Sequence, residues 1–459
     1  MSVQTGNSQV KHVLKQWVTA GLLSLQASLS LASDIPKAVT HVEFPTPGAT
    51  SVLLGRDLFY DPILSGNGNI SCATCHHPGF GSGDAMSLSI GEGGMGLGPE
   101  RIARPDTMPL ARIPRNAPPL YNLGAYEFTT MFYDGRVQTD PDARFGIRMP
   151  AGFALERTVT SPLAAQAILP IMSHDEMAGQ PGENPLADAI AAGKIRGPGG
   201  AWQMVAARVS SVPDYKQRFE WIYGARDPIH ITQIGQAIAD FIAFEFRSTN
   251  SPFDAFLNGD DSALTNDQLR GMSLFYGKAQ CSSCHSGAFQ TDHRFYSIGI
   301  PQLGPGKGHG PDYADHGRGA ITGDAQDAYR FRTPSLRNVT LTAPYGHSGA
   351  YSQLEDIVRH HLDPLTMLAE YSIEKARLHD ISFGTPDAQA LEDFDEMLNI
   401  AIAVEIEPVA LDDAEIAAIL SFLQSLEDPI ARTGRLGIPD AVPSGLPLDP
   451  RPASAAAPS

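Results

Sequence analysis

The chain has 459 residues, 42% of them hydrophobic, so it is long enough for two or three domains with substantial cores. Its 33 basic residues are outnumbered by 51 acidic ones, which gives a net charge of −18. This balance disfavours a nucleic-acid-binding protein, which needs clustered Lys and Arg. It suits a basic protein partner, although acidity also serves solubility.

The N-terminus is typical of an export signal. Lys11 and Lys15 precede an apolar run from Trp17 to Leu31, and small residues surround a cleavage point after Ala32. The run is short and Ser-rich, whereas a membrane span needs about 20 mostly apolar residues. We therefore expect residues 1–32 to be removed and the mature protein to be periplasmic without a membrane span. An uncleaved anchor is the alternative.

A short pattern, Gly-x-x-Leu-Phe-Tyr, occurs twice. It covers Gly55–Tyr60 and Gly271–Tyr276, each time shortly before a pair of cysteines. A pattern repeated in register with another motif indicates duplicated units. The sequence therefore predicts two related tandem domains, at residues 40–255 and 256–435.

The remaining elements are mostly helical. Apolar spacing predicts short helices over residues 163–171 and 186–195, and a longer one over 231–246. Ser251-Pro252 ends that helix, and Thr265 is a suitable N-cap for a helix over 266–276. Further helices are predicted over 354–362 and 412–426. The Pro- and Ala-rich residues 436–459 are predicted to be a disordered tail. Because strand signals are few, the fold class is mainly α with extensive loops.

All four cysteines lie in two Cys-x-x-Cys-His frames. The first frame is Cys72-Ala73-Thr74-Cys75-His76 and the second is Cys281-Ser282-Ser283-Cys284-His285. Such a frame attaches haem c: the thiols form thioethers and the adjacent imidazole binds the iron. A zinc site would need four clustered ligands, and thioredoxin-like chemistry does not explain the histidines. The doubled frame therefore predicts two covalent haem c groups.

The first frame has no evident second axial ligand. Between His77 and Arg115 there is no further histidine, only Met86, Met95 and Met108. An iron with an open face suits a site that binds peroxide.

These motifs resemble those of the bacterial diheme cytochrome c peroxidases and the related MauG-type enzymes. The resemblance extends from about Gly55 to Leu426. Its blocks are Leu54–Pro62 with Leu64-Ser65 and the first frame, Phe132–Arg136, Asp175–Met177, the second frame, and Thr333–Asn338 running into Leu341–Gly349. The resemblance implies two cytochrome-c-like domains with a calcium ion at their interface.

The resemblance also implies roles for individual residues. His76 would bind the peroxidatic haem and His285 the electron-transfer haem. Glu176 matches the distal carboxylate that acts as acid and base over the peroxide. The matches to the calcium ligands are Asn116 and the backbone oxygens of Thr342 and Pro344, which are the oxygen donors that a hard cation prefers.

The sequence departs from the family pattern at the second haem. Fourteen residues after the conserved His347, the peroxidases have Met and the MauG-type enzymes have Tyr, whereas this chain has His361. A bis-histidine second haem follows, with a lower potential than a Met-ligated one. Met367 and His360 are the alternative ligands.

Two further departures concern the first haem and the space between the haems. The inter-haem position, often Trp in the family, is Tyr133, which could serve as a stepping stone for electrons or a radical site, or simply pack in the core. The displaceable histidine of many peroxidases has no counterpart in the matching loop. We therefore expect the first haem to react without reductive activation.

Three functions remain open at this stage. The first is a peroxidase that reduces hydrogen peroxide with electrons from a small cytochrome c or cupredoxin. The second is a MauG-like enzyme that uses peroxide to oxidise residues of a partner protein. The third is a non-enzymatic diheme electron carrier.

Overall fold

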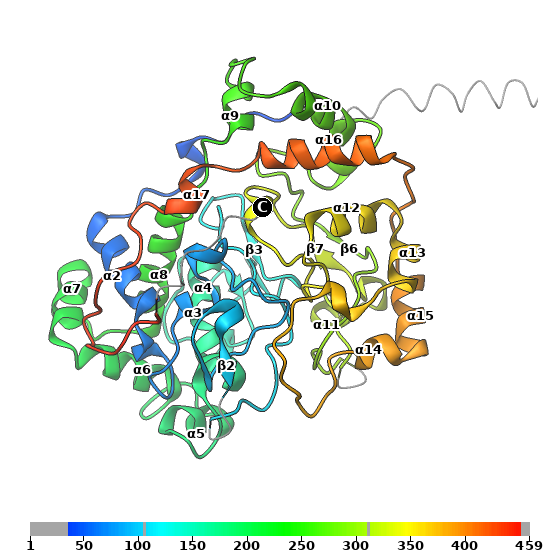
Figure 1. Cartoon of the computed structure of the whole chain (residues 1–459). Helices are drawn as coiled ribbons and strands as arrows, with labels where there is room; N and C mark the ends of the chain where they lie inside the picture. Colours follow the sequence, from blue (N-terminus) through cyan, green and yellow to red (C-terminus); the bar gives the residue numbers. More distant parts are fainter. Residues whose placement is uncertain (1–34, 104–106, 310–312, 451–459) are drawn as a thin grey trace, which may run out of the picture.

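The computed structural model describes residues 35–103, 107–309 and 313–450. The predicted signal peptide lies outside the described residues. The described chain is mainly helical, as predicted, with long loops between the helices (Figure 1). No helix in these residues is both long and apolar enough to span a bilayer.

The first half of the chain contains helices α2 to α9. Their bounds are α2 Ala49–Tyr60, α3 Cys72–Cys75, α4 Pro162–Ile168, α5 Pro185–Ala191, α6 Ala201–Ser210, α7 Pro213–Tyr223, α8 Ile231–Glu245 and α9 Pro252–Leu257. The second half contains α10 Asn266–Tyr276, α11 Gly319–Thr322, α12 Leu354–Leu362, α13 Pro364–Ala369, α14 Gln389–Glu392, α15 Phe394–Ile402, α16 Asp413–Gln424 and α17 Ile430–Thr433.

In the described residues, three small antiparallel sheets link loops to one another and do not form a layer of the fold. They are β1 Gly94–Met95 with β2 Ile102–Ala103, β3 Thr130–Met131 with β4 Val137–Thr139 and β5 Ile147–Arg148, and β6 Phe295–Tyr296 with β7 Phe331–Arg332. In the last pair, Phe295 lies opposite Arg332 and Tyr296 opposite Phe331. This register holds the chain after the second frame against the Thr333–Asn338 block.

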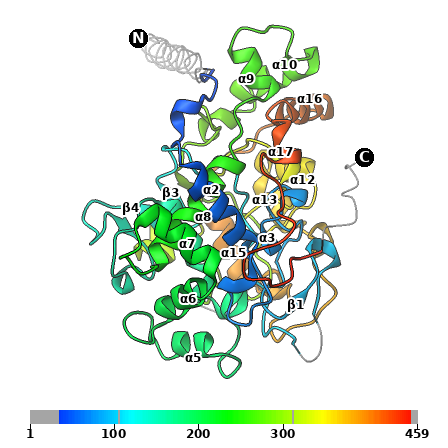
Figure 2. The ribbon, with the colours of Figure 1, turned by 90° about the vertical axis from the view of Figure 1, so that its left-hand side faces the viewer.

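The repeated Gly-x-x-Leu-Phe-Tyr pattern forms the same helix crossing twice. A Cβ on Gly55 of α2 would lie 1.8 Å from the carbonyl oxygen of Ala237 in α8, so only glycine fits. A Cβ on Gly271 of α10 would lie 1.9 Å from the carbonyl oxygen of Ala418 in α16. The two crossings lie in different parts of the molecule (Figures 1 and 2).

The aromatic residues of the pattern also pack alike. The rings of Phe59 and Phe241 have centroids 5.2 Å apart, and those of Phe275 and Phe422 are also 5.2 Å apart. Phe241 and Phe422 lie one helical turn after the contacted alanines. The sequence repeat is therefore a structural repeat.

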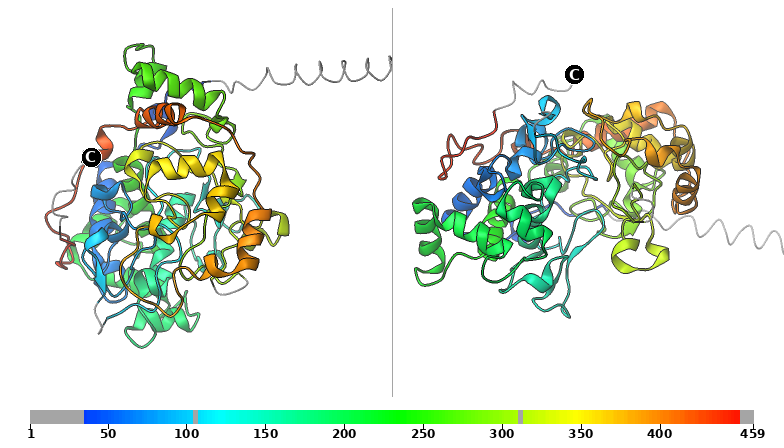
Figure 3. Two further views of the ribbon diagram at one scale, coloured as in Figure 1. Left: turned by 45° about the vertical axis from the view of Figure 1, so that its right-hand side comes forward. Right: turned by 90° about the horizontal axis from the view of Figure 1, so that it is seen from below.

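Each half has its own hydrophobic core. The first core is built on α2, α4, α6 and α8, and the second on α10, α12 and α16. Seen from below, the two halves lie side by side (Figure 3). They also exchange side chains: Phe289 of the second half packs against Phe44 and Phe128 in the first core, and Leu88 of the first half belongs to the second core.

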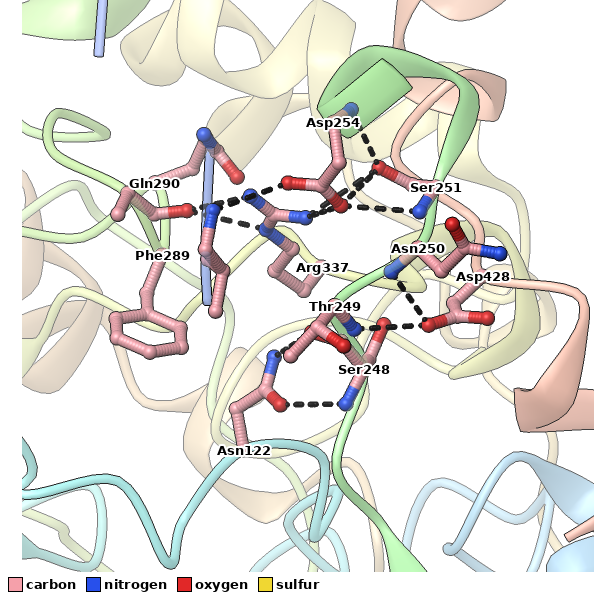
Figure 4. A network of polar contacts seen from close by, with 12 residues as sticks. Asn122, Ser248, Thr249, Asn250, Ser251, Asp254, Phe289, Gln290, Arg337 and Asp428 are labelled. Carbon is pink, nitrogen blue, oxygen red and sulfur yellow. Dashed lines mark hydrogen bonds and ion pairs between the residues drawn. The ribbon is translucent and has the colours of Figure 1, made fainter. Parts of the chain in front are cut away.

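The connection between the halves is fixed by buried polar groups (Figure 4). Ser248 N donates to Asn122 Oδ1 at 2.7 Å, and Asp428 accepts from the backbone of Thr249 at 2.8 Å. At the start of α9, Asp254 forms an ion pair with Arg337, whose side chain is fully buried. The predicted boundary after residue 255 falls inside α9.

The predicted disordered tail needs correction for residues 436–450. This segment runs back along the first half, past α2 (Figure 1). Val442 is buried in the first core, Ser444 Oγ donates to Asp61 Oδ1 at 2.7 Å, and Thr74 Oγ1 donates to Asp449 Oδ2 at 2.5 Å. A Pro-rich composition does not prevent a segment from packing when its few apolar side chains meet a complementary surface. Residues 451–459 lie outside the described residues.

Candidate functional site

The first frame forms a single helical turn, α3, that presents His76 at its end. Thr74 Oγ1 accepts from the Ser71 backbone and caps the turn at 3.0 Å. His76 Nδ1 donates to the Ser82 carbonyl at 3.0 Å, which leaves Nε2 for another partner. Burial lowers the pKa of His76, so the ring is neutral. A neutral imidazole oriented by a backbone carbonyl is the usual arrangement of a metal-binding histidine.

The second frame repeats this arrangement. Cys281–Ser283 forms a short turn, and His285 Nδ1 donates to the Gln290 carbonyl at 3.2 Å. Burial, followed by the nearby His361, lowers the pKa of His285 to about 4. The ring is therefore also neutral, with Nε2 free.

A cavity of about 720 Å³ adjoins the second frame, and its lining is mostly apolar. His285 and His361 both line it, and their ring centroids are 6.2 Å apart. His361 Nδ1 donates to the Ile357 carbonyl at 2.8 Å, one turn back in α12, so its Nε2 is free. Two metal–imidazole bonds of about 2 Å and the two half-rings span roughly 6 Å. The separation therefore fits one metal ion between the rings.

The two alternative ligands are placed differently. His360 Nε2 donates to the Ile298 carbonyl at 2.6 Å, and its Nδ1 pairs with the Tyr351 hydroxyl at 2.9 Å. Both of its ring nitrogens are therefore occupied. Met367 packs against the second core and is not among the residues that line the cavity.

Two polar side chains in the cavity wall are incompletely paired among the described residues. Arg332 donates only to backbone carbonyls, those of Phe132 at 3.2 Å and Thr333 at 3.5 Å, and burial lowers its pKa to about 10. His347 stacks on Phe331 with centroids 3.6 Å apart, and neither of its ring nitrogens has a partner. Buried polar groups are normally paired, so the cavity suits a large apolar group that also carries acidic substituents. Haem, with its two propionates, is such a group.

Glu176 lies in a five-residue π-type turn, His174–Ala178. Ser173 Oγ accepts from the Glu176 backbone N–H at 3.3 Å and caps the turn. Burial raises the pKa of Glu176, and the charges of Arg136 and Lys307 oppose that rise. The carboxylate also acts electrostatically on Cys75, so the fold brings it close to the first frame.

Tyr133 and the three predicted calcium ligands meet at the cavity. Asn116, Thr342, Pro344 and Tyr133 all line it, and Asn116 and Thr342 also line a small adjacent cavity. The Tyr133 hydroxyl lies 3.4 Å from Asn116 Oδ1, and burial raises the pKa of Tyr133. No group of three or more His, Cys, Asp or Glu in the described ranges could hold a metal. A cation here would rely on amide and backbone oxygens.

A buried ion network that sequence reasoning missed holds these loops together. Arg115 donates to both carboxylate oxygens of Asp315 at 2.7 Å and to Asp134 Oδ2 at 2.6 Å. Arg136 Nη1 lies 3.0 Å from Asp134 Oδ2. Although burial would raise it, Arg115 holds the pKa of Asp315 well below its ordinary value. The sequence signal was the Phe132–Arg136 block, whose Asp134 had no assigned role.

Comparisons with known proteins identify relatives of most of the chain. A family profile described as di-haem cytochrome c peroxidase matches residues 49–262. The methylamine utilization protein MauG of Methylorubrum extorquens is 31% identical over 73% of this chain and 75% of its own length. Cytochrome c551 peroxidase of Pseudomonas aeruginosa is 30% identical over 74% and 79%, respectively.

Solved structures give the same result for the fold. A crystal structure of a MauG-like protein associated with microbial copper homeostasis is 28% identical, covers 86% of this chain and 95% of its own, and superposes with a TM-score of 0.53. The diheme peroxidase BthA of Burkholderia thailandensis is 19% identical, covers 91% and 94%, and has a TM-score of 0.57. At that identity the second match concerns the fold alone.

Proposed function

The chain belongs to the di-haem cytochrome c peroxidase and MauG family and is a peroxidase-like diheme oxidoreductase; from this premise we propose that it reduces hydrogen peroxide at one haem c in the periplasm, with electrons relayed through a second. Curated relatives are named cytochrome c peroxidases. The electron-carrier alternative has no support among these names.

The two frames would hold the haems. Cys72, Cys75 and His76 would hold one, and Cys281 and Cys284 would attach the other. His285 and His361 would then bind the second iron from opposite sides. When bound, the haems would supply irons that exchange single electrons, and the first would provide the site of peroxide reduction.

The observation that carries the proposal is the unequal surroundings of the two frames. His361 faces His285 across the cavity at a separation suited to one iron. The first frame instead has a carboxylate of raised pKa, Glu176, within electrostatic reach of Cys75. One site is arranged for electron transfer and the other for proton transfer.

Glu176 would move the proton that peroxide reduction requires. Its carboxylate would take the proton from the near oxygen of the peroxide and return it to the far oxygen, which leaves as water when the O–O bond breaks. Two electrons from the reduced donor and two further protons would convert the near oxygen to a second water. Because its pKa is raised, the carboxylate is a stronger base than an exposed one. The charge of Arg136 opposes this rise and so favours the ionised carboxylate.

Between the sites, Tyr133 would carry electrons and a calcium ion would fix the loops. The calcium ligands would be Asn116 and the backbone oxygens of Thr342 and Pro344. Asn116 already bridges the halves, since its backbone N–H donates to the His347 carbonyl at 2.8 Å. Carbonyl and amide oxygens are the donors that Ca²⁺ prefers.

The second candidate is a MauG-like enzyme that uses peroxide to oxidise a partner protein. The 31% identity to MauG favours it. An oxidised form that persists for minutes after peroxide addition, with little turnover of reduced cytochrome c, would establish this alternative. Steady consumption of peroxide with reduced cytochrome c would establish the peroxidase.

Electron paramagnetic resonance of the oxidised protein tests the proposal directly. We expect one low-spin signal from the second haem and one high-spin signal from the first, and only the latter should change with peroxide. The Glu176→Gln variant should keep both signals and react with peroxide about 10²-fold more slowly, because the loss of a general acid–base group costs 10²- to 10⁴-fold. Two low-spin signals that ignore peroxide would refute the proposal.

A further inference from the structure

Helix α15 carries a stripe of exposed apolar side chains. Phe394 is 76% exposed, Leu398 44% and Ile402 73%, and they recur every four residues along one face. The stripe is about 12 Å long, from the helical rise of 1.5 Å per residue. Single exposed apolar residues are ordinary, but a continuous row marks an interaction surface.

The opposite face of α15 belongs to the cavity of the second frame. Ile400 is buried and lines that cavity, while Glu396 is buried against the Tyr329 hydroxyl at 3.1 Å. The helix therefore separates the cavity from solvent by a single layer. In Figure 1 it lies at the right-hand edge of the molecule, away from the first half.

The chain after α15 continues this thin wall. Residues 405–409 line the cavity, and Glu405, Glu407 and Pro408 are also exposed to solvent. Glu405 acts electrostatically on Cys284 of the second frame. The edge of a haem attached there would be close to this surface.

Acidic residues flank the stripe at both ends. Glu392 and Asp395 lie at its N-terminal end, and Glu407 lies beyond its C-terminal end. All three side chains are exposed and have no hydrogen-bond or ion-pair partner in the described part of the chain. Glu405, by contrast, is neutralised by Arg330, whose Nε lies 3.0 Å away. The unpaired carboxylates would attract a basic partner and repel a second copy of this acidic chain.

We infer that α15 and residues 405–409 form the docking surface for a small redox protein with a lysine-rich face, which delivers electrons to the second haem. This inference rests on the proposed function. The apolar stripe would exclude water at the centre of the contact, and the carboxylates would steer the partner. Short-lived redox complexes are small, below about 1,200 Å² of buried area, which matches a single helix and its flanking loop.

Steady-state kinetics with reduced, lysine-rich cytochrome c as the probe test the surface. For each variant of the holoenzyme, two second-order rate constants are measured with peroxide as the oxidant. One is for cytochrome c as the electron donor and the other is for a small-molecule reductant, and the first is divided by the second. We expect Leu398→Ser with Ile402→Ser, and separately Glu407→Lys with Asp395→Lys, to lower this ratio about tenfold or more. Phe153→Ser, which changes a 70% exposed side chain of the first half, should leave it unchanged.

Salt and chemical modification sharpen the test. The wild-type ratio should fall as ionic strength rises, and the charge-reversal variant should lose that dependence. Cytochrome c with succinylated lysines should be a poor donor to the wild type, and the charge-reversal variant should lose less activity by this modification because its new lysines attract the added carboxylates. If the ratio stays at the wild-type value in both double variants, or if they change only self-association, the docking surface is refuted. If no variant turns over with either reductant, including the wild type, the proposed function itself fails.

Discussion

His361 and its neighbour His360 show how hydrogen bonds can distinguish a candidate ligand from a structural residue. His360 is fully buried in α12 and uses both ring nitrogens, whereas the half-buried His361 uses only Nδ1. Only His361 lines the cavity opposite His285. The residue fourteen positions after His347, His361, is therefore also the one whose Nε2 is available to bind a metal.

This difference gives a ligand test. The His361→Ala variant should convert the second haem from a low-spin to a high-spin or water-bound form, because one axial nitrogen is lost. Electron paramagnetic resonance measures the change. Met367→Leu is the matched control and should retain the wild-type spectrum. A low-spin signal that survives in His361→Ala would assign the ligand elsewhere.

The charge of Arg136 should set the pH dependence of Glu176. Burial raises the pKa of Glu176, and Arg136 is the largest charge that lowers it. In the Arg136→Met variant the pKa of Glu176 should rise further. The reaction with peroxide needs the ionised carboxylate, so when the pH is lowered its rate should begin to fall at a higher pH than in the wild type. Met preserves packing on Phe132, over which the guanidinium lies at 3.5 Å.

Stopped-flow rates of peroxide reaction against pH measure this shift. Arg148→Met provides the control, since Arg148 lies in β5, beside the strand that Arg136 directly precedes, but is exposed and pairs with Asp140. Its acid limb should coincide with that of the wild type. An acid limb in Arg136→Met that stays in place, or moves to lower pH, would contradict the argument.

At the scale of elements, the glycines of the repeat determine how closely the helices approach. Gly271 allows α10 to lie against the backbone of α16, with room for no other side chain. The same contact recurs between Gly55 and α8. The Gly-x-x-Leu-Phe-Tyr pattern is therefore explained by a close helix crossing. The glycine allows the two backbones to touch, and the aromatic residues fill the space beside this contact.

Gly271→Ala should destabilise the second half. Its Cβ would meet the Ala418 carbonyl, so the helices must separate, and overpacking of this kind typically costs about 1–3 kcal/mol. Gly384→Ala is the control, because a Cβ there meets no atom within 4 Å. Chemical denaturation compares the two. Equal unfolding midpoints would show that the crossing tolerates the extra methyl group.

Some helices could be predicted from sequence and others could not. Helices α8, α10 and α16 occur where expected, since each combines apolar spacing with a cap, such as Thr265 with Gln268. Helix α7 was not predicted. It buries only Tyr215 and Phe219, so its hydrophobic signal is weak.

At the scale of the whole molecule, buried ion pairs join the two halves, and besides Arg115 with Asp315 there is the pair of Arg337 with Asp254. Arg337 follows the second frame and Asp254 begins α9, and their side chains are 0% and 1% exposed. Burial alone would raise the pKa of Asp254, but Arg337 and Ser251 lower it below its ordinary value. The pair therefore contributes stability above the ordinary carboxyl pKa, and this contribution is lost as pH falls through the lowered one.

Arg337→Met should cost about 3–5 kcal/mol of unfolding free energy at neutral pH, because it leaves a buried carboxylate unpaired. Arg359→Met, which removes a partly exposed ion pair with Glu355, should cost less than about 1 kcal/mol. Chemical denaturation of both variants provides the comparison. A loss in Arg337→Met no larger than in Arg359→Met would show that the pair contributes little.

The sequence by itself determined the cofactor chemistry, the repeat and the strongest helices. Cys-x-x-Cys-His needs only one turn of chain to place two thiols and an imidazole, so its meaning is local. Tertiary structure alone decided which groups stand opposite these frames. Residues 436–450 pack on the first core, Glu176 approaches Cys75, and His361 rather than His360 faces His285. Each depends on surfaces supplied by segments far apart in the chain, and such long-range complementarity leaves no periodic signal in sequence.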